Sequence, residues 1–390
     1  MAQTFHRDRF TWLAYLLLAF YGYFLNVLGP ITPFLKGELE LSYTVSSLHF
    51  TAFALGILLI GLGGHFVIQR LGRWRSLWVG AVGMSLSAGL LVMGRTPVIT
   101  IGASFLMGLV GSLILAIVPA ALSEQHGERR AVALSEANVI SSLVATAAPL
   151  LVGWFALSIV GWRLALGLVA LTPIVLYVGL GKSISSAITS TRSDPLPIKQ
   201  PLPGLFWIYW AAIVLAVSVE FCMISWSADY LENALNMLKT EAAQAVSLFF
   251  AGMILGRMAG TRLAQRFSIP RLVTAAILLA SLGFLIFWKS GGVLMGLGGL
   301  FLTGLGVANL YPLILSLAIG ASHNNPIQAS ARSALASGAA ILTLPLVLGR
   351  LADAVGIGPA YGVVVVLLVS VFLIIQLTGR ISPMYQPVID

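Results

Sequence analysis

Apolar residues in this chain gather in long runs, and the length of these runs is what most limits the possible folds. A helix needs roughly 20 mostly apolar residues to cross the hydrocarbon core of a bilayer. Twelve runs are long enough, and they cover residues 10–35, 43–68, 76–94, 97–122, 131–157, 162–182, 204–231, 242–265, 271–288, 292–321, 328–353 and 358–380. The first run is too long for the core of a signal peptide, so we expect an uncleaved helix there. The pattern predicts an all-α integral membrane protein with twelve transmembrane helices.

Composition excludes a soluble domain. Only 9% of the residues are charged, whereas soluble proteins carry about 25%, and the mean hydropathy is +0.97. The net charge of +9 would suit nucleic acid only if the basic residues formed one face. They lie instead in short segments between the apolar runs, so we expect no nucleic-acid partner and assign them to cytoplasmic loops.

The basic residues also predict the orientation of the chain. If the N-terminus is cytoplasmic, most Lys and Arg residues fall in inner segments, and the outer segments hold only Lys36, Arg95, Arg163, Lys239 and Lys289. This bias follows the positive-inside rule. With an even number of crossings, it places both termini in the cytoplasm, and we expect the plasma (bacterial inner) membrane.

Residues that could hold a metal or a cofactor are scattered. The chain has one cysteine, Cys222, and five histidines in separate segments, so neither a disulfide nor a structural metal site is expected. The sequence contains no Walker A phosphate loop and no convincing nucleophile–base arrangement. We therefore predict no cofactor and no enzymatic activity. Because the sequence has no ATP-binding loop, we expect any work that this membrane protein performs to draw its energy from an ion gradient.

A Ser-, Thr- and Pro-rich segment, SISSAITSTRSDPLPIKQPLP, separates the first six runs from the last six. It predicts a cytoplasmic linker, residues 183–203, between an N-terminal bundle, residues 1–182, and a C-terminal bundle, residues 204–390. One constant displacement of the sequence aligns residues of the two halves: Gly56 with Gly252, Gly64 with Gly260, Gln69 with Gln265, Arg70 with Arg266, Arg75 with Arg271, and Pro149 with Pro345. Two pseudo-symmetric six-helix bundles are therefore predicted, with solute bound between them near the midplane.

The segment GGHFVIQRLGRWR, residues 63–75, follows the second run. It resembles the glycine, acid, basic-Gly-Arg signature between helices 2 and 3 of the major facilitator superfamily, through Arg70, Gly72, Arg73 and Arg75. Gln69 stands where the signature has an acid, and the leading glycine is displaced to Gly64. Together with the twelve runs, the linker and the repeat, the resemblance covers essentially the whole chain. It implies the major facilitator fold and a secondary transporter that works by alternating access.

The resemblance also implies a cytoplasmic gate at this loop, which helps to hold the inner side closed. We assign to the gate the loop residues, their counterparts in the second half, and two charged residues at the starts of helices 5 and 11: Gln69, Arg70, Arg73, Arg262, Arg266, Glu136 and Arg332. Glu136 is expected to pair with Arg262 or Arg266 across the bundles. Two alternatives stay open, namely that the arginines only set the topology and that Glu136 is a solvated carboxylate at a loop edge.

In this superfamily, helices 1, 4, 7 and 10 line the cavity. On the first run, Tyr23 and Asn26 share a face, and the Asn26 amide donates and accepts hydrogen bonds, as a sugar hydroxyl requires. Asn26 could instead join neighbouring helices. On the tenth run, we prefer Asn309 as a solute-binding residue over Tyr311, which points roughly the opposite way, and we expect Pro312 to bend the helix.

The seventh run contains VSVEFCMISWSADYL, residues 217–231, which resembles helix 7 of fucose-permease-like sugar transporters. Glu220 lies near mid-span, where a carboxylate is costly unless it is paired, solvated or protonated. We predict that Glu220 binds solute or couples protons. The alternative is a structural pair with an arginine, but the family geometry does not obviously bring Arg257 to it.

Two further residues of the seventh run are assigned to the site. Asp229 lies nearer the outer end and on another side of the helix, and it is a second proton-coupling residue. Trp226 stacks on a sugar ring, or it anchors the helix at the membrane interface.

These residues predict symport of a sugar or similar polar solute with protons, by a monomer surrounded by membrane lipids; sodium coupling stays open. The alternative is a proton-coupled drug or multidrug efflux antiporter. Efflux cavities are typically more apolar and aromatic, so Asn26 and Asn309 favour a polar solute. A membrane sensor on the same fold usually carries long tails or signalling domains, and we do not expect one.

Overall fold

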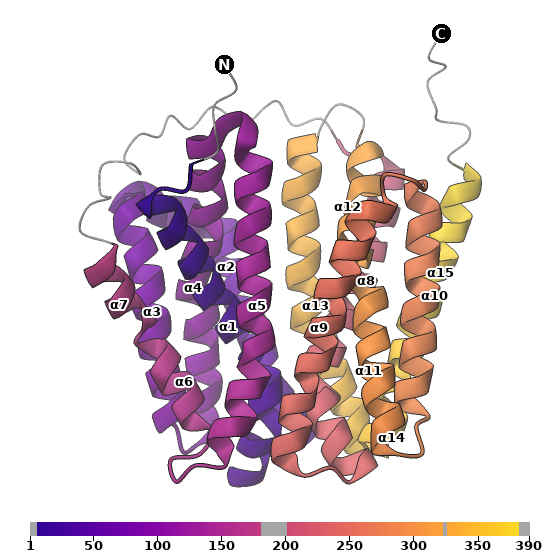
Figure 1. Cartoon of the computed structure of the whole chain (residues 1–390), viewed down its shortest axis with the longest axis horizontal. Coiled ribbons are helices and arrows are strands. Elements are labelled where there is room, and N and C mark those ends of the chain that lie inside the picture. Colours follow the sequence, from indigo (N-terminus) through magenta and orange to yellow (C-terminus); the bar gives the residue numbers. More distant parts are fainter. Residues whose placement is uncertain (1–5, 181–200, 323–325, 382–390) are drawn as a thin grey trace. The chain divides into compact units, whose positions relative to one another are not determined.

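The structure is a computed structural model, and it describes residues 6–180, 201–322 and 326–381 (Figure 1). Eleven helical segments of the described chain are long and apolar enough to cross a membrane, with Val293–Gly320 counted as one, and a shorter apolar segment, Arg163–Gly179, accounts for the sixth predicted crossing. The expected all-α membrane architecture is therefore confirmed. Of the predicted linker, only residues 201–203 lie within the described part of the chain.

The helices fall into two sets along the chain. The first set is α1 (Arg9–Glu38), α2 (Tyr43–Leu71), α3 (Arg73–Met93), α4 (Pro97–His126), the 3₁₀ turn η1 (Gly127–Arg129), α5 (Arg130–Ala156), α6 (Arg163–Ala170) and α7 (Thr172–Gly179). The second set is α8 (Gly204–Leu235), α9 (Lys239–Leu263), α10 (Ile269–Trp288), α11 (Val293–Val307), α12 (Leu310–Gly320), α13 (Pro326–Val355), α14 (Ile357–Ala360) and α15 (Val363–Ile381).

Contacts between residues divide the chain into two compact units. The N-terminal unit comprises Met1–Leu196 and Leu238–Ser247, and the C-terminal unit comprises Pro197–Met237 and Leu248–Asp390. The first turns of α9 thus group with the N-terminal unit, and the rest of α9 groups with the C-terminal unit. The domain boundaries drawn from the linker stay a prediction.

The tenth apolar run is not one helix. α11 ends at Val307, Ala308 and Asn309 form a turn, and α12 begins at Leu310. Pro312 occupies the third position of α12, where the missing N–H needs no partner within the helix. The break therefore lies just before the proline that was expected to bend the helix.

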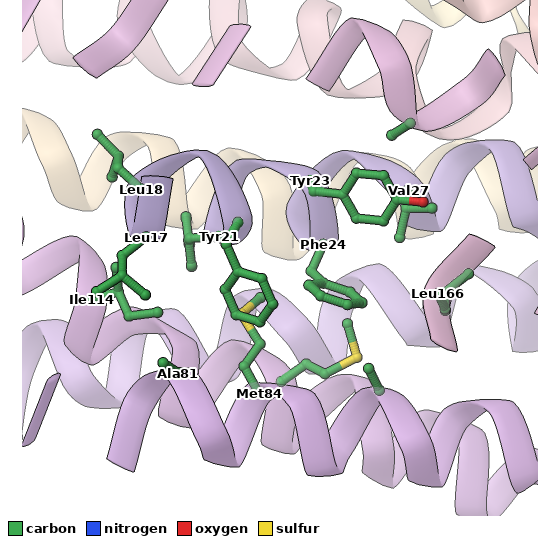
Figure 2. Close-up of a cluster of buried hydrophobic side chains, with 14 of the residues drawn as sticks. Leu17, Leu18, Tyr21, Tyr23, Phe24, Val27, Ala81, Met84, Ile114 and Leu166 are labelled. Atoms are coloured by element: carbon green, nitrogen blue, oxygen red, sulfur yellow. The ribbon is translucent and has the colours of Figure 1, made fainter. Parts of the chain in front are cut away.

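The core of the N-terminal unit is apolar and centres on α1, most of whose residues are buried. α1 packs on α4 and α5, and both α2 and α3 pack on α4. Figure 2 shows Tyr21 and Phe24 of α1 beside Met84 of α3. In the C-terminal unit α8 is the central helix, and it packs on α12, α13 and α15.

The same helix crossing occurs once in each unit. Where α2 crosses α4, a Cβ atom on Gly108 would overlap the carbonyl oxygen of Phe53, and a Cβ atom on Gly56 would overlap the backbone nitrogen of Leu109. Small residues let helices approach this closely in lipid. The α9–α11 crossing of the C-terminal unit repeats these contacts.

In that second crossing, Gly304 meets the backbone of Phe249, and Gly252 meets the backbone of Phe301 and Leu305. The displacement that aligns Gly56 with Gly252 also aligns every other residue of the two crossings, and the residue types are identical. The predicted pseudo-symmetry is therefore present in the packing of each bundle.

Candidate functional site

Glu220 is the central residue of the candidate site. It lies near the middle of α8, roughly 24 Å along the axis from Gly204 at 1.5 Å per residue, and its side chain is half-buried. The charge of Arg257, on α9, acts on Glu220. The sequence analysis left a structural pair of Glu220 with an arginine as an alternative, and this alternative stays open.

Tyr311 and Ser337 extend this polar cluster. The Tyr311 side chain, at the start of α12, is within range of the charge of Glu220 and of a hydrogen bond with Ser337 of α13. Both α12 and α13 pack directly on α8. The solute site that the sequence predicts on the tenth run therefore has Tyr311, rather than Asn309, next to Glu220.

Asn309 serves the packing of the helix break. Its Nδ2 donates to the carbonyl oxygen of Gly256 on α9 at 2.7 Å, and a Cβ atom on Gly260 would overlap its side-chain amide. Asn309 is partly buried in this contact. Because its amide holds α9 against the break, the structure gives Asn309 a packing role, and its binding of solute stays a prediction.

Trp226 occupies neither of the places expected for it. Its side chain is fully buried, and its indole Nε1 donates to the carbonyl oxygen of Pro345 on α13 at 3.1 Å. An indole enclosed by its own bundle is available neither for stacking on a solute nor for anchoring at the interface. Helical periodicity placed Trp226 on a face of α8 but carried no information about what that face packs against.

Asp229 is buried in a second cluster, closer to the far end of α8. Its exposed fraction is 1%, and its charge acts on Tyr361. The Tyr361 hydroxyl donates to the carbonyl oxygen of Cys222 at 3.0 Å and lies 3.4 Å from the hydroxyl of Ser227. Asp229 is nine residues beyond Glu220, which is about 13 Å along the helix, so the structure does not bring the two acids together.

On α1, the two predicted solute-binding residues have different surroundings. Tyr23 is buried, and its hydroxyl donates to the carbonyl oxygen of Ala165 on α6 at 3.0 Å; Figure 2 shows it within the apolar core. Tyr23 thus packs within its own unit, and its predicted contact with the solute stays a prediction. Asn26 is partly exposed, and its Nδ2 donates to the carbonyl oxygen of Gly22 in the preceding turn at 2.7 Å.

The loop between α2 and α3 has a backbone conformation that favours a glycine. Gly72 has φ +80°, a conformation that favours glycine. Arg73 then pairs with Glu124 at the end of α4 through two contacts, Nη1–Oε2 at 2.5 Å and Nη2–Oε1 at 3.0 Å. Gln69 and Arg70 are exposed. The sequence analysis missed Glu124 as the partner of this arginine.

Glu136 pairs with the N-terminal segment. The guanidinium of Arg7 donates to both of its carboxylate oxygens, and the Tyr15 hydroxyl donates to Oε2 at 3.2 Å. The expected pairs with Arg262 or Arg266 would join different units, and they stay a prediction.

A second set of contacts holds the same segment. Asp8 caps α1 by accepting from the backbone N–H of Thr11 at 2.8 Å. It also accepts from Gln125 at 2.5 Å, and the Thr11 hydroxyl lies 2.9 Å from Nε2 of His126. We call Arg7, Asp8, Thr11, Gln125, His126 and Glu136 the N-terminal clasp. An Asp just before an apolar run is an N-cap signal that the sequence already contained.

The gate residues of the second half are exposed. Arg262, Gln265 and Arg266 lie at the end of α9 and just beyond it, and Arg332 lies near the start of α13. The backbone oxygen of Arg332 accepts from the indole Nε1 of Trp210 at 2.8 Å. Within the described residues, no group of three or more His, Cys, Asp or Glu side chains could hold a metal ion.

Two units of helices long and apolar enough to cross a membrane, each with the same helix crossing, define a polytopic membrane protein. The sequence model of the Major Facilitator Superfamily matches residues 12–318. The chain therefore belongs to this superfamily, as the signature at residues 63–75 indicated.

The chain is also similar to individual members. It is 24% identical over 361 residues to an uncharacterised MFS-type transporter of Yersinia pestis, and the match covers 88% of this chain and 89% of the relative. Its fold is similar to that of a bacterial homologue of the human lysosomal transporter Spinster in an inward-facing, occupied conformation (TM-score 0.75, 14% identity, 95% and 96% of the two chains). A mutant of the nucleoside transporter NupG gives a TM-score of 0.75 at 11% identity over 97% and 99% of the chains.

Proposed function

We propose that this chain is a secondary active transporter that couples the movement of a polar solute to that of protons, with Glu220 as the residue that exchanges the proton. Its membership of the superfamily supports membrane transport. The observation that carries the coupling is the position of Glu220, half-buried near the middle of α8 and within range of the charge of Arg257. Ionisable residues inside membrane spans are expensive and commonly mark solute or proton pathways.

A polar solute fits the groups available around this acid. Tyr311 and Ser337 supply hydroxyls on the C-terminal unit. Separately, on the N-terminal unit, Asn26 is partly exposed and keeps one amide hydrogen and its carbonyl oxygen beyond the bond to Gly22. A nucleoside transporter is among the proteins of similar fold, and its solute is likewise rich in hydrogen-bonding groups. Tyr23 and Trp226 are assigned to the packing of their bundles.

The basic residues support the orientation. In the N-terminal unit, the clasp and the Arg73–Glu124 pair join the starts of α1, α3 and α5 to the end of α4. This end also carries exposed Arg70 and Arg75, so we assign it to the cytoplasm. Both termini are then cytoplasmic in a plasma (inner) membrane, and the protein acts as a monomer without a cofactor and without enzymatic activity.

The inner ends also hold the proposed gate. It comprises Gln69, Arg70, Arg73, Glu136, Arg262, Arg266 and Arg332. Asp229 stays a second proton-coupling candidate, and the position of Glu220 makes Glu220 the first residue to test.

The experiment uses the purified protein in proteoliposomes that contain a pH-sensitive dye. A panel of sugars, nucleosides, organic acids and lipophilic cations is added outside, and proton entry is recorded. We expect one class of polar solute to drive proton entry in the wild type and not in Glu220→Gln. Glu241→Gln is the matched control, because Glu241 is an exposed carboxylate in the first turn of α9.

Proton movement that persists in Glu220→Gln would contradict the assigned role. Proton release driven only by lipophilic cations would instead favour the efflux antiporter.

A further inference from the structure

We propose that one face of α5 is the N-terminal unit's part of the solute site, and that this face selects a neutral solute by the hydroxyl hydrogens that the solute donates. The inference rests on the proposed function, because it names the chemical class of the solute and a surface that recognises it. The face consists of polar residues, which we call the polar face of α5: Ser135, Asn138, Ser142 and Thr146.

The side chains of α5 fall into three faces. At about 100° per residue, the polar residues lie within about 80° of one another. A second set, centred about 90° further round the helix, is apolar and exposed, and it consists of Val139, Leu143, Leu150 and Trp154. A third set is buried in the bundle, and it consists of Ala133, Ala137, Ala148 and Val152. Lipid accounts for the apolar face and helix packing for the buried one, so the polar face has a third environment.

Asn138 indicates that this environment is water. It lies about 9 Å along the axis from Val132, where the membrane-spanning part of α5 begins, and its side chain is exposed. Its Nδ2 donates to the carbonyl oxygen of Leu134 at 2.8 Å, and the amide keeps a second hydrogen and the oxygen Oδ1 for other partners. Such groups are costly to expose to hydrocarbon, so we place the polar face on an aqueous path within the spans.

Burial along the polar face increases toward one end. Its first two residues are exposed, the next two are half-buried, and Gly153, on the same side of α5, is buried. The first turns of α9, which group with the N-terminal unit, cover Gly153: a Cβ atom there would overlap Cγ of Gln244 and the carbonyl oxygen of Thr240. Water and solute therefore reach the polar face from the end of the bundle that carries the N-terminal clasp.

The repeat provides an internal comparison. The displacement that aligns Pro149 with Pro345 aligns the polar face with four residues of α13, and they are Ala331, Ala334, Gly338 and Leu342. The proline is common to both helices, whereas the polar side chains belong to α5 alone. Packing of this helix in a six-helix bundle therefore does not require a polar face, and its presence in the N-terminal half points to recognition.

The polar face offers mainly hydrogen-bond acceptors. The Thr146 hydroxyl donates its single hydrogen to the carbonyl oxygen of Ser142 at 2.8 Å, so its oxygen can only accept from a solute. Asn138 keeps two lone pairs on Oδ1 and one N–H. None of the residues of the face is a carboxylate, which could balance the charge of an ammonium group. A solute bound here must bring its own hydrogens, and the hydroxyl groups of a sugar or polyol supply them without charge.

Asn26 extends these acceptors to α1. A Cβ atom on Gly22 would overlap Oγ of Ser141, so α1 touches α5 at this level. The two helices run in the same direction. Asn26 lies one turn beyond Gly22, and Thr146 lies just over one turn beyond Ser141. Asn26 and Thr146 are therefore at a similar depth, where one solute can contact both.

Cysteine labelling tests whether the polar face lies in water, and it needs no knowledge of the solute. Cys222 is fully buried, so it adds little background. In membrane fragments open to both sides, a charged thiosulfonate reagent should label Asn138→Cys and Ser142→Cys. Val139→Cys and Leu143→Cys, each one residue further along, are the matched controls on the apolar face, and they should react slowly because a thiol in apolar surroundings is rarely ionised. Equal rates at all four positions would overturn the assignment.

Fluorinated probes test the chemistry of recognition. Hexoses, polyols and nucleosides are added to the detergent-purified chain, and a probe that binds only the folded state raises the unfolding midpoint. We expect this from at least one neutral probe, such as D-glucose, D-sorbitol or uridine. In its deoxyfluoro derivatives, fluorine replaces one hydroxyl with little change in size and donates no hydrogen. At least one derivative should bind about two- to tenfold more weakly.

Equal binding of every deoxyfluoro derivative would show that donated hydrogens are not recognised. Stabilisation by no neutral probe, or by lipophilic cations alone, would equally overturn the inference.

A variant of Thr146 then assigns the recognition to the polar face. Thr146→Val keeps the shape and removes the acceptor, so it should weaken binding about two- to tenfold and leave the midpoint without solute nearly unchanged. Thr146→Ser should restore affinity. Thr343→Val is the matched control, because Thr343 is an exposed threonine of α13 that donates to the carbonyl oxygen of Ala339 at 2.8 Å. If Thr146→Val does not fold, Ser142→Ala carries the same expectation. Unchanged affinity, or an equal loss in Thr343→Val, would contradict the role of the face.

The outcomes are distinguishable from those of the proposed function. If Glu220→Gln abolishes solute-driven proton entry while Thr146→Val binds normally, the polar face is wrong and the proton-coupled transporter stands. If Thr146→Val weakens binding of a hydroxyl-rich probe while Glu220→Gln still moves protons, the polar face stands and the role of Glu220 in coupling is wrong.

Discussion

Both carboxylate oxygens of Glu136 accept hydrogen bonds from the guanidinium of Arg7, one from Nε at 2.8 Å and one from Nη2 at 2.6 Å. The contact joins the segment before α1 to the first turns of α5, which are far apart in sequence. Hydrogen bonding to Glu136 also raises the pKa of Arg7, so the pair stays charged throughout the physiological range. Glu136 therefore has a partner within its own unit.

We expect Glu136→Gln to release the N-terminal segment while the bundle stays folded. The Arg7 and Glu136 side chains are 46% and 29% exposed, and exposed ion pairs contribute little to global stability. Trypsin should cleave faster after Arg7 and Arg9, and high salt should produce the same effect in the wild type. At Arg9, the site that all the variants keep, Arg7→Gln/Glu136→Gln should be cleaved as fast as either single variant, because the two residues act as one contact. Unchanged cleavage would show that the pair does not hold the segment.

The cap at Asp8 predicts a pH dependence. Burial alone would raise the pKa of Asp8, but hydrogen bonds from Thr11 and Gln125 outweigh it, so the pKa lies below its usual value. The stabilisation is therefore fully present above the unfolded value of about 3.9, and it is lost as the pH falls through the lower folded value. The protection of amides in the first turn of α1, measured relative to their intrinsic exchange rates at each pH, should be constant near neutral pH and should fall only in acid.

Substitution of the cap gives the complementary result. Asp8→Ala should raise exchange in that turn already at neutral pH, because losing an N-cap costs about 1 kcal/mol. Asp8→Asn should cost less, because an amide oxygen can still accept from the Thr11 N–H. Acceleration in Asp8→Ala that begins only below pH ~4 would mean that the cap contributes nothing near neutrality.

Glycines at the repeated crossing should tolerate no side chain. Gly108→Ala and Gly304→Ala each place a methyl group on the backbone of the neighbouring helix, and overpacking of this kind costs about 1–3 kcal/mol or more. Gly102→Ala and Gly298→Ala are matched controls on the same helices, since nothing lies within 4 Å of their Cβ positions. The controls should be neutral or slightly stabilising. Equal melting midpoints for all four variants would contradict the close approach.

Substitutions of Trp226 and Tyr311 should have different effects, one on stability and the other on solute binding. Trp226→Phe removes the hydrogen bond to Pro345, and such bonds between membrane helices are worth about 0.6 kcal/mol on average. It should lower the melting midpoint slightly and leave solute affinity unchanged. Tyr311→Phe removes a hydroxyl next to Glu220, so it should lower solute affinity and leave the midpoint nearly unchanged. If Trp226→Phe lowered solute affinity and Tyr311→Phe lowered only the melting midpoint, Trp226 would belong to the solute-binding site.

The sequence predicted the spans well because a bilayer imposes a length and an apolar composition on every crossing. It predicted the repeat because both halves satisfy the same packing contacts. It did not place the turn at Ala308 and Asn309, since the signal for a bend in the tenth run was Pro312, three residues beyond Asn309.

The candidate site was harder to predict, because periodicity assigns residues to faces of a helix without saying which neighbour each face meets. Tyr23 and Trp226 lie on plausible polar stripes, yet both donate to backbone carbonyls inside their own bundles. Arg257 was recognisable as a charge within a span. Its proximity to Glu220 depends on how α8, α9 and α12 pack, and no local pattern in the chain contains that information.

The crossing of Phe53 and Gly108 and the crossing of Phe249 and Gly304 have a consequence for the history of the chain. Both are built from the same residue types, whereas many surrounding positions of the two halves differ. At these points a backbone touches a backbone, so a substitution in either copy has no neighbouring side chain that could shrink to compensate. A duplicated six-helix segment can diverge almost everywhere else, and the traces of its common ancestor persist longest where the helices touch most closely.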